Sequence, residues 1–94
     1  MHAMVRTYSG QGASEVFDLV EQKQDEVKDL IGGVPGFVSY AAIRTADGGM
    51  TVTVCEDKAG TEDSARRAAE FVKQNATGLA SPPDIAEGTA VLQF

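Results

Sequence analysis

The nine residues from Gly32 to Tyr40 (Gly-Gly-Val-Pro-Gly-Phe-Val-Ser-Tyr) constrain the fold more than any other stretch of the chain. They follow a segment with helical spacing of apolar residues and precede one with the composition of a strand. Gly32 suits the left-handed conformation that ends a helix, and Pro35 prevents the helix from continuing. The stretch therefore predicts a helix end, a chain reversal and a strand start in close succession.

The segment before this stretch is predicted to form one amphipathic helix from Ser14 to about Ile31. Ser14 is a good N-terminal cap, and acidic residues follow it in the first turn. Apolar residues recur on one face of this helix, namely Phe17, Val20, Val27 and Ile31, with Val16 and Leu30 flanking them. Lysines interleave with the acids of the other face, which indicates a solvated, salt-bridged surface rather than a metal site. Those acids are Glu21, Asp25, Glu26 and Asp29.

Four strands and a second helix complete the predicted elements. The strands cover 3–8, 37–45, 50–56 and 86–94, with a hairpin at 47–49 and a loop at 81–83. Thr61 is the predicted cap of the second helix, which runs to about Ala76 and ends at Gly78. The apolar stripe of this helix is rich in alanine: Ala65, Ala68, Ala69, Val72, Ala76 and Leu79.

The order β-α-β-β-α-β predicts an α+β, ferredoxin-like domain over residues 1–94, with a four-stranded antiparallel sheet and both helices on one face. Two helices cover only one face of such a sheet. Neither alternating set of residues in the second strand is strongly polar, so we expect a second copy of the chain to bury the other face. The alternative is an open, solvated face.

Composition narrows the classes of partner. The net charge of −6 argues against nucleic acid and against anionic membrane surfaces. One cysteine allows no internal disulfide, and a single histidine, His2, leaves too few ligands for a classical zinc site. The N-terminus lacks a signal-peptide pattern and no apolar run approaches 18 residues, so we expect a cytoplasmic protein.

Two motifs resemble those of a known family. Pro35-Gly36-Phe37-Val38-Ser39-Tyr40 precedes the predicted hairpin, and Val54-Cys55-Glu56-Asp57 precedes the second helix. With the order of elements, they resemble the dimeric α/β-barrel superfamily, and within it the antibiotic biosynthesis monooxygenase-like proteins. The resemblance implies a homodimer whose two sheets form a barrel, and a small-molecule pocket between the helices and the sheet of each subunit.

The resemblance also bears on chemistry. The family includes quinone-forming monooxygenases that use no cofactor, haem-degrading enzymes and proteins of unassigned function. Cys55 stands where the family often has Trp or Tyr, the second helix lacks the His that members often carry, and the chain has no Trp. Haem degraders of this family use Asn, Trp and His together, so haem degradation is not expected, and neither a cofactor nor a metal is predicted.

Gln24 is the most unusual position of the first helix. It lies between Val20 and Val27 in the apolar stripe, where a polar group needs a hydrogen-bond partner. It is predicted either to bind a ligand in a pocket or to bond a backbone group or lie at a wet edge. The alanines of the second helix likewise favour either close packing against the sheet or room for a ligand.

Further candidate ligand-binding residues lie on the strands. Tyr8 and Tyr40 offer hydroxyls that orient a phenolic substrate, and Arg6 and Arg44 offer guanidinium groups that hold a carboxylate. The alternatives are tyrosines at sheet edges and arginines paired with glutamates across a dimer. Cys55 is a candidate nucleophile or a buried small hydrophobe, and Asn75 is a candidate pocket residue or a helix cap.

Two functions remain open from the sequence. The first is a small homodimeric monooxygenase that oxidises an aromatic or polyketide-like molecule without a cofactor. The second is a non-catalytic or regulatory dimer that binds a small molecule or a partner protein, which the missing Trp and His favour. Pocket volume and turnover of a phenolic substrate distinguish these functions from each other and from a filled structural module.

Overall fold

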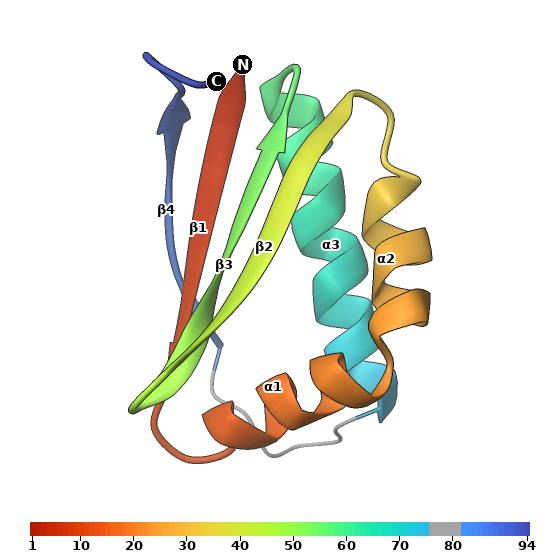
Figure 1. Cartoon of the computed structure of the whole chain (residues 1–94), viewed down its shortest axis with the longest axis vertical. Coiled ribbons are helices and arrows are strands. Elements are labelled where there is room, and N and C mark those ends of the chain that lie inside the picture. Colours follow the sequence, from red (N-terminus) through yellow and green to blue (C-terminus); the bar gives the residue numbers. More distant parts are fainter. Residues whose placement is uncertain (76–81) are drawn as a thin grey trace.

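The computed structural model describes residues 1–75 and 82–94, which form an antiparallel sheet with helices on one side (Figure 1). The sheet has four strands in the order β2-β3-β1-β4. The elements along the chain are β1 (His2–Ser9), α1 (Ala13–Gln22), α2 (Gln24–Gly32), β2 (Phe37–Thr45), β3 (Gly48–Cys55), α3 (Lys58–Asn75) and β4 (Asp84–Thr89). The predicted ferredoxin-like fold is confirmed, with one helix divided in two.

The first predicted helix is broken at Lys23, which has non-helical φ and ψ of −118° and 37°. Because of this break, α1 lies across the end of the sheet while α2 runs along β2 (Figure 1). The apolar stripe predicted for one helix therefore lies on two helices that meet at an angle. Spacing alone did not reveal the break, because Val20 and Val27 keep the same helical phase on both sides of it.

Both predicted N-terminal caps are wrong. Gly12, with a φ of 85°, precedes α1, and Ser14 already lies inside that helix. At α3 the carboxylate of Asp57 accepts a hydrogen bond of 3.0 Å from the backbone N–H of Gly60. The helix consequently begins three residues before Thr61, whose hydroxyl donates to the carbonyl of Lys58 instead.

Two predicted ends also differ. Gly32, predicted to be left-handed, is instead the last residue of α2, and Gly33 stays right-handed. Within the stretch from Gly32 to Tyr40 the left-handed glycine is Gly36, with a φ of 79°. The last strand ends at Thr89 rather than Phe94, because Thr89 already pairs with His2 at the start of β1, and one further bond joins the N–H of Ala90 to the carbonyl of Met1 at 2.9 Å. The predicted helix end at Gly78, with Ala76, Leu79 and Ser81, lies outside the described residues.

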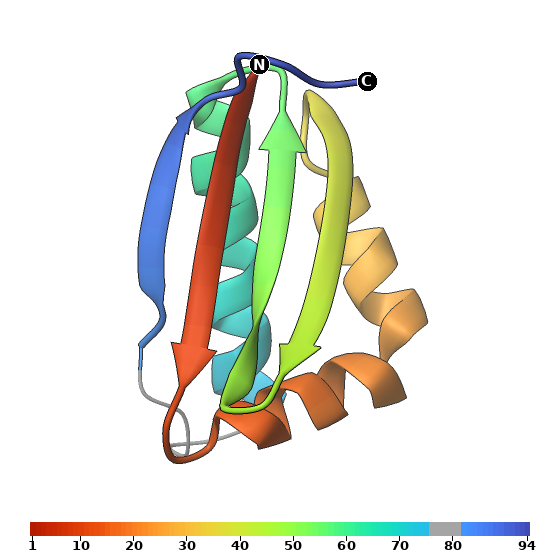
Figure 2. The same cartoon turned by 60° about the vertical axis from the view of Figure 1, so that its left-hand side comes forward.

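The two faces of the sheet differ in what covers them. On β1, Met4, Arg6 and Tyr8 are buried beneath the helices, and the alternate residues face away. None of the helices in the described part of the chain covers that second face (Figure 2). By strand register, its residues are mostly apolar: Ala3, Val5, Ala41, Ile43, Met50, Val52 and Ala86. The prediction that this face is partly apolar is confirmed.

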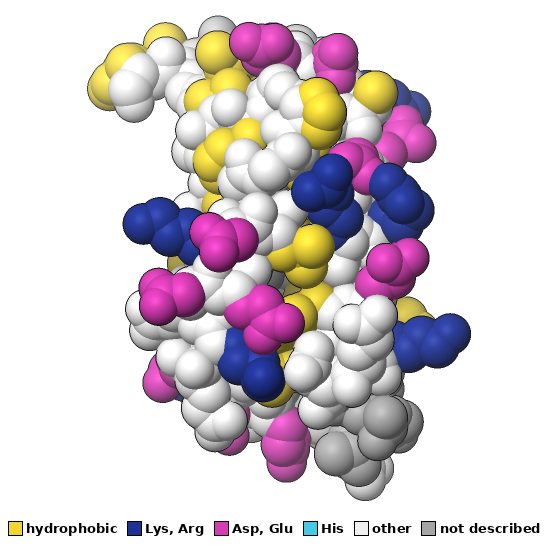
Figure 3. Space-filling view, turned by 90° about the vertical axis from the view of Figure 1, so that its right-hand side faces the viewer, with side chains coloured by type: hydrophobic (Ala, Val, Ile, Leu, Met, Phe, Trp, Pro, Cys, Tyr) yellow, Lys and Arg dark blue, Asp and Glu magenta, His cyan; other side chains and the backbone are white. Residues whose placement is uncertain are grey.

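The helices present a different surface to the outside. Lysine, arginine and acidic side chains are interspersed over the helical side, with a narrow apolar strip between them (Figure 3). The Lys23–Glu26 ion pair at 3.6 Å belongs to this surface, as the charge pattern predicts. No helix in residues 1–75 and 82–94 is long and apolar enough to cross a membrane.

The alanine-rich helix α3 packs differently along its length. Near its start it approaches the sheet so closely that a Cβ on Gly60 would lie 2.7 Å from the Cβ of Cys55. Near its end Ala68, Phe71 and Val72 line a small cavity instead. Close packing, one of the two predicted alternatives, thus describes the start of the helix, whereas the cavity near its end has room for about one water.

Candidate functional site

Arg6 lies on the central strand β1 with its side chain directed toward the helices. It alternates with half-buried residues of the other face, and only 2% of its surface is exposed. β3 pairs with β1 so that Thr51 stands directly opposite Arg6. The position on an inner strand, beneath α3, places this guanidinium in the interior of the chain.

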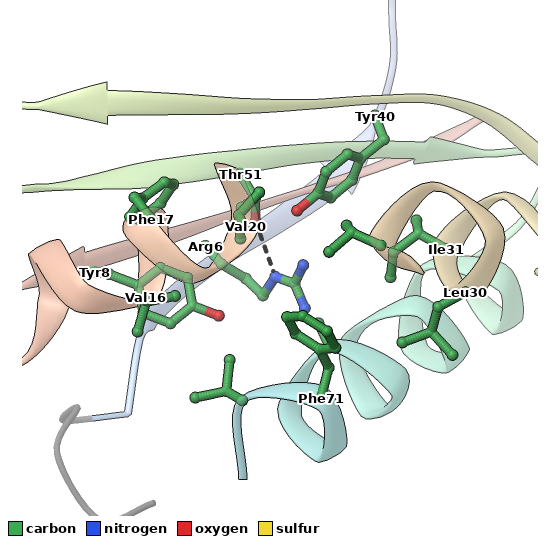
Figure 4. Close-up of a pocket in the computed structure, with 13 residues that line it drawn as sticks. Arg6, Tyr8, Val16, Phe17, Val20, Leu30, Ile31, Tyr40, Thr51 and Phe71 are labelled. Atoms are coloured by element: carbon green, nitrogen blue, oxygen red, sulfur yellow. Dashed lines mark hydrogen bonds between the residues drawn. The ribbon is translucent and has the colours of Figure 1, made fainter. Parts of the chain in front are cut away.

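The guanidinium of Arg6 is only partly satisfied. Its Nε donates a hydrogen bond of 3.1 Å to the hydroxyl of Thr51, and its buried Nη2 has no hydrogen-bond partner (Figure 4). No carboxylate among residues 1–75 and 82–94 forms an ion pair with it. An unpaired buried cation is costly for a fold, so this side chain is the main polar feature of the interior.

The surroundings of Arg6 are apolar. A cavity of about 20 Å³, enough for about one water molecule, lies between the sheet and the three helices. Side chains from every helix line it together with Arg6, Thr51 and the two tyrosines: Val16, Phe17, Val20, Val27, Leu30, Ile31, Ala68, Phe71 and Val72. A charge in such a lining interacts more strongly with a ligand than it would in water.

Both tyrosines belong to this cavity. The ring of Tyr8 packs edge-on against Phe17, with centroids 5.8 Å apart, and Tyr8 is 7% exposed. The hydroxyl of Tyr40 points toward the Arg6 guanidinium (Figure 4). Burial raises the pKa of Tyr40, and the positive charge of Arg6 partly opposes that rise. Tyr40 therefore stays protonated at neutral pH and offers a hydrogen-bond donor.

A larger groove lies beside the cavity. It has a volume of about 880 Å³ and runs between α2 and β2. Four residues line both hollows, namely Val20, Val27, Ile31 and Tyr40. Only a wall one side chain thick therefore separates the open groove from the buried arginine.

The structure thus brings together three of the predicted site residues: Arg6, Tyr8 and Tyr40. Sequence reasoning missed Thr51, which holds the arginine, and Phe71, which closes the cavity from α3. The available signal was the alternation of side chains between the two faces of a strand. Arg6 and Tyr8 alternate with Val5 and Thr7 on one strand, and Thr51 alternates with Val52 on another.

Arg44, by contrast, is an exposed ion-pair residue. Its guanidinium lies 2.8 Å from Glu21 and 3.0 Å from Asp18, both on α1. These carboxylates raise the pKa of Arg44, with the hydrogen bond to Glu21 as the largest cause. Within this chain acidic side chains of α1 accept hydrogen bonds from Arg44, and its role in ligand binding stays a prediction.

Two further candidates are structural. Cys55 is 0% exposed, and burial, with the nearby charge of Asp57, raises the pKa of its thiol. Both observations favour the buried small hydrophobe over the nucleophile among its predicted alternatives. Asn75 is exposed at the end of α3, where its side-chain amide donates to the carbonyl of Phe71 at 2.8 Å. It caps the helix and lines no part of the cavity or groove.

Gln24 occupies the rim of the groove. It begins α2 directly after the break at Lys23, and its side chain is exposed. Of its predicted alternatives, the wet edge describes its state in this chain, because the helix break turns it out of the apolar stripe. It still lines the groove, together with Lys28 and Tyr40.

The fold resembles several solved structures. NE2512, a protein of unknown function from Nitrosomonas europaea, superposes with a TM-score of 0.72 and 18% identity, over 99% of this chain and 90% of that chain. A mutant of SnoaB, a cofactor-independent oxygenase from Streptomyces nogalater, has a TM-score of 0.67 and 16% identity, over 99% and 95%. MhuD, a heme degrader from Mycobacterium tuberculosis, has a TM-score of 0.67 and 15% identity, over 100% and 99%.

The residues present here do not fit a heme, although MhuD holds two hemes in its active site. The cavity of about 20 Å³ has no room for a porphyrin, and among the side chains that hold heme iron its lining offers neither histidine nor cysteine but only the two tyrosines. His2 lies toward the opposite end of β1 from Tyr8, where its ring contacts Thr61 at 2.9 Å and Glu87 at 3.6 Å.

Sequence comparison adds no assignment, since no protein-family model and no curated protein matches the chain. The three structural neighbours are an oxygenase, a heme degrader and a protein of unknown function, which are the three kinds of protein that the sequence resemblance implies. Their identities of 15 to 18% establish the fold alone. A putative antibiotic biosynthesis monooxygenase from Chloroflexus aurantiacus also shares the fold, with a TM-score of 0.65 and 11% identity over 99% of this chain and 95% of that chain, so the predicted likeness to such proteins is confirmed at the level of the fold.

Proposed function

We propose that the protein binds an aromatic or polyketide-like anion at Arg6 and oxidises it with O₂, without a cofactor. The observation that supports this proposal most directly is the unpaired, buried Nη2 of Arg6 in an apolar cavity. A buried cation without a carboxylate partner gains most from an anionic ligand. Phenolate or enolate oxygen supplies that charge at neutral pH when the aromatic system is acidic enough.

The side chains around Arg6 suit this chemistry in a specific way. The guanidinium stabilises the substrate anion, while Tyr40 and Tyr8 direct hydroxyl groups into the same hollow. The lining contains no carboxylate and no histidine to act as a base, so the substrate has to ionise readily by itself. A ring CH₂ group then becomes a carbonyl as one O₂ is consumed and one water is released.

The test uses 1,8-dihydroxy-9-anthrone, an acidic anthrone that is oxidised to an anthraquinone. Oxygen uptake and quinone absorbance are followed for the wild type, Arg6→Met and Arg44→Met. We expect Arg6→Met to lower kcat/KM by about a hundredfold, because it removes a preorganised charge from the reacting anion. Arg44→Met should retain the wild-type rate. Equal rates for wild type and Arg6→Met would overturn the oxygenase proposal.

A second candidate function is non-catalytic binding of the same class of anion. The absence of a general base from the cavity lining favours it. Binding of the anthraquinone product that depends on Arg6, without oxygen uptake from the anthrone above the buffer rate, would support this alternative over the oxygenase.

We also propose that the protein is a homodimer that pairs through the face of the sheet opposite the helices. Its apolar residues support this, since Ile43 remains 44% exposed near the end of β2. Val91, Leu92 and Phe94 add exposed apolar surface beyond β4. Analytical ultracentrifugation should give a dimer for the wild type and a monomer for Val52→Lys. A monomeric wild type would contradict the proposal.

The expected cytoplasmic location also stays a proposal. The single cysteine, whose thiol is buried and free, is in keeping with a reducing compartment.

A further inference from the structure

The small cavity at Arg6 and the groove between α2 and β2 share one wall. We propose that they form a single composite ligand site, in which the cavity takes an anionic end group and the groove takes a flat aromatic body. Tyr40 forms the movable part of the wall between them. This inference rests on the proposed binding of an anion at Arg6 and adds the shape and charge of the ligand.

The two volumes divide the ligand between them. A space of about 20 Å³ admits little more than one water, so it holds at most the charged atoms of a ligand. The groove, at about 880 Å³, lies within the range of sites for drug-sized molecules. An anion that reaches Arg6 therefore has to leave most of its body in the groove.

The charges around the two hollows favour a ligand with one anionic group, because the charges of Lys28 and Asp29 at the rim of the groove offset each other. Arg6 has the only buried donor of positive charge that lacks a partner among residues 1–75 and 82–94. The floor of the groove is formed by Val20, Val27, Ile31 and Phe37, and its polar residues lie at the rim. A net charge of −6 also disfavours a ligand with several negative charges. The structure therefore favours an aromatic monoanion of two or three fused rings.

Tyr40 is the side chain that we expect to move when the cavity and the groove join. It is half-buried, it belongs to the edge strand β2, and its hydroxyl faces the guanidinium (Figure 4). The rest of the shared wall comes from both sides of the helix break, with Val20 on α1 and Val27 and Ile31 on α2. A turn of one ring on the edge strand joins cavity and groove without unfolding a helix.

The test measures the affinity of the full chain for fluorescent 2-anthracenecarboxylate. Gln24→Trp places a bulky ring at the rim of the groove, and Gln22→Trp is the matched control, exposed at the end of α1 and lining neither hollow. We expect Kd to rise at least tenfold for Gln24→Trp and to stay within about twofold for Gln22→Trp. Tyr40→Ala should raise the association rate constant several-fold, because it removes the ring that separates the cavity from the groove.

The outcomes separate the composite site from the anion site. If Arg6→Met weakens binding while Gln24→Trp behaves like Gln22→Trp, the groove is not part of the site and the composite site is wrong, although the anion site stands. Wild-type binding that is indifferent to both Arg6→Met and Gln24→Trp contradicts both proposals. A wild type that fails to bind the probe overturns the composite site, and anthrone turnover then tests the proposed function separately.

Discussion

Arg6 and Arg44 belong to the same sheet and point toward the same helical side, yet they have opposite surroundings. Arg6 pairs through strand register with Thr51, whereas Arg44 pairs with Gly49, two positions earlier on β3. Arg6 is buried with one nitrogen unsatisfied, and Arg44 is exposed with two carboxylates around it.

Strand position accounts for this difference. β1 is an inner strand beneath α3, where helix side chains exclude both water and acidic partners. β2 is an edge strand beside α1, whose acidic outer face lies within reach of a long side chain. The guanidinium on the edge strand β2 thus links that strand to α1 through ion pairs, while the guanidinium on the inner strand β1 remains available to a ligand.

Gly49→Ala should have the largest effect on this comparison, because Gly49 lies between Tyr8 of β1 and Arg44 of β2. An added Cβ would lie 2.5 Å from the ring of Phe17 and 2.6 Å from the carbonyl oxygen of Ile43. The backbone cannot yield easily, so we expect the free energy of unfolding to fall by about 3 kcal/mol.

Urea denaturation checks this value. Gly32→Ala is the control, since no atom lies within 4 Å of its added Cβ and alanine favours the helix. A Gly49→Ala variant as stable as wild type would show that the two arginine regions adjust independently.

Arg6→Met sharpens the comparison by separating stability from function. The substitution removes an unpaired buried charge and keeps much of the side-chain volume. We expect the free energy of unfolding to rise by about 2 kcal/mol, although ligand binding is lost. Urea denaturation of the unliganded protein measures this. A destabilised Arg6→Met would mean that the bond to Thr51 outweighs the cost of burial.

Tyr40 reports the charge of Arg6 through its own titration. Its folded pKa is raised above 10.0, so its contribution to stability is present below that pH and is lost as pH rises through the folded value. Raising the pH into the alkaline range should therefore lower the Tm of the wild type more than the Tm of Tyr40→Phe, as measured by thermal unfolding.

Arg6 opposes the rise in the pKa of Tyr40. Ultraviolet titration of tyrosine should thus show a higher pKa for Tyr40 in Arg6→Met and an unchanged one in Arg44→Met. An unchanged pKa in Arg6→Met would place the guanidinium farther from the hydroxyl than Figure 4 shows.

Arg44→Met should have the smallest effect. Its ion pairs with Asp18 and Glu21 are exposed, and salt screens such pairs. We expect a slight decrease in Tm at low ionic strength that disappears in 1 M NaCl. A large decrease that persists in salt would show that Arg44 is as important to the fold as the buried core.

Much of the fold was predictable from local patterns. The second strand was predicted with its observed bounds, Phe37–Thr45, because Pro35 and Gly36 leave little freedom at its start. The division at Lys23 was not predictable, since the residues around it keep a helical phase. The end of β4 at Thr89 depends on where β1 begins, which is a long-range pairing that local spacing does not contain.

The candidate site was predicted as a set of residue types rather than as an arrangement. Arg6, Tyr8 and Tyr40 were candidates together with Arg44, Cys55 and Asn75, and only packing divided the two groups. Alternation along β1 put Arg6 on the same side as Met4 and Tyr8. That the side is the covered one, and that no acid of the helices reaches it, followed only from the folded chain.

The sequence by itself determined the order of elements, the apolar stripe of the helices and the apolar second face of the sheet, because periodicity and turn residues act over a few neighbours. Tertiary structure decided which arginine is buried without an ion-pair partner and which is exposed and ion-paired. That outcome depends on strand order and on the bend at Lys23, which bring residues far apart in the chain around one guanidinium.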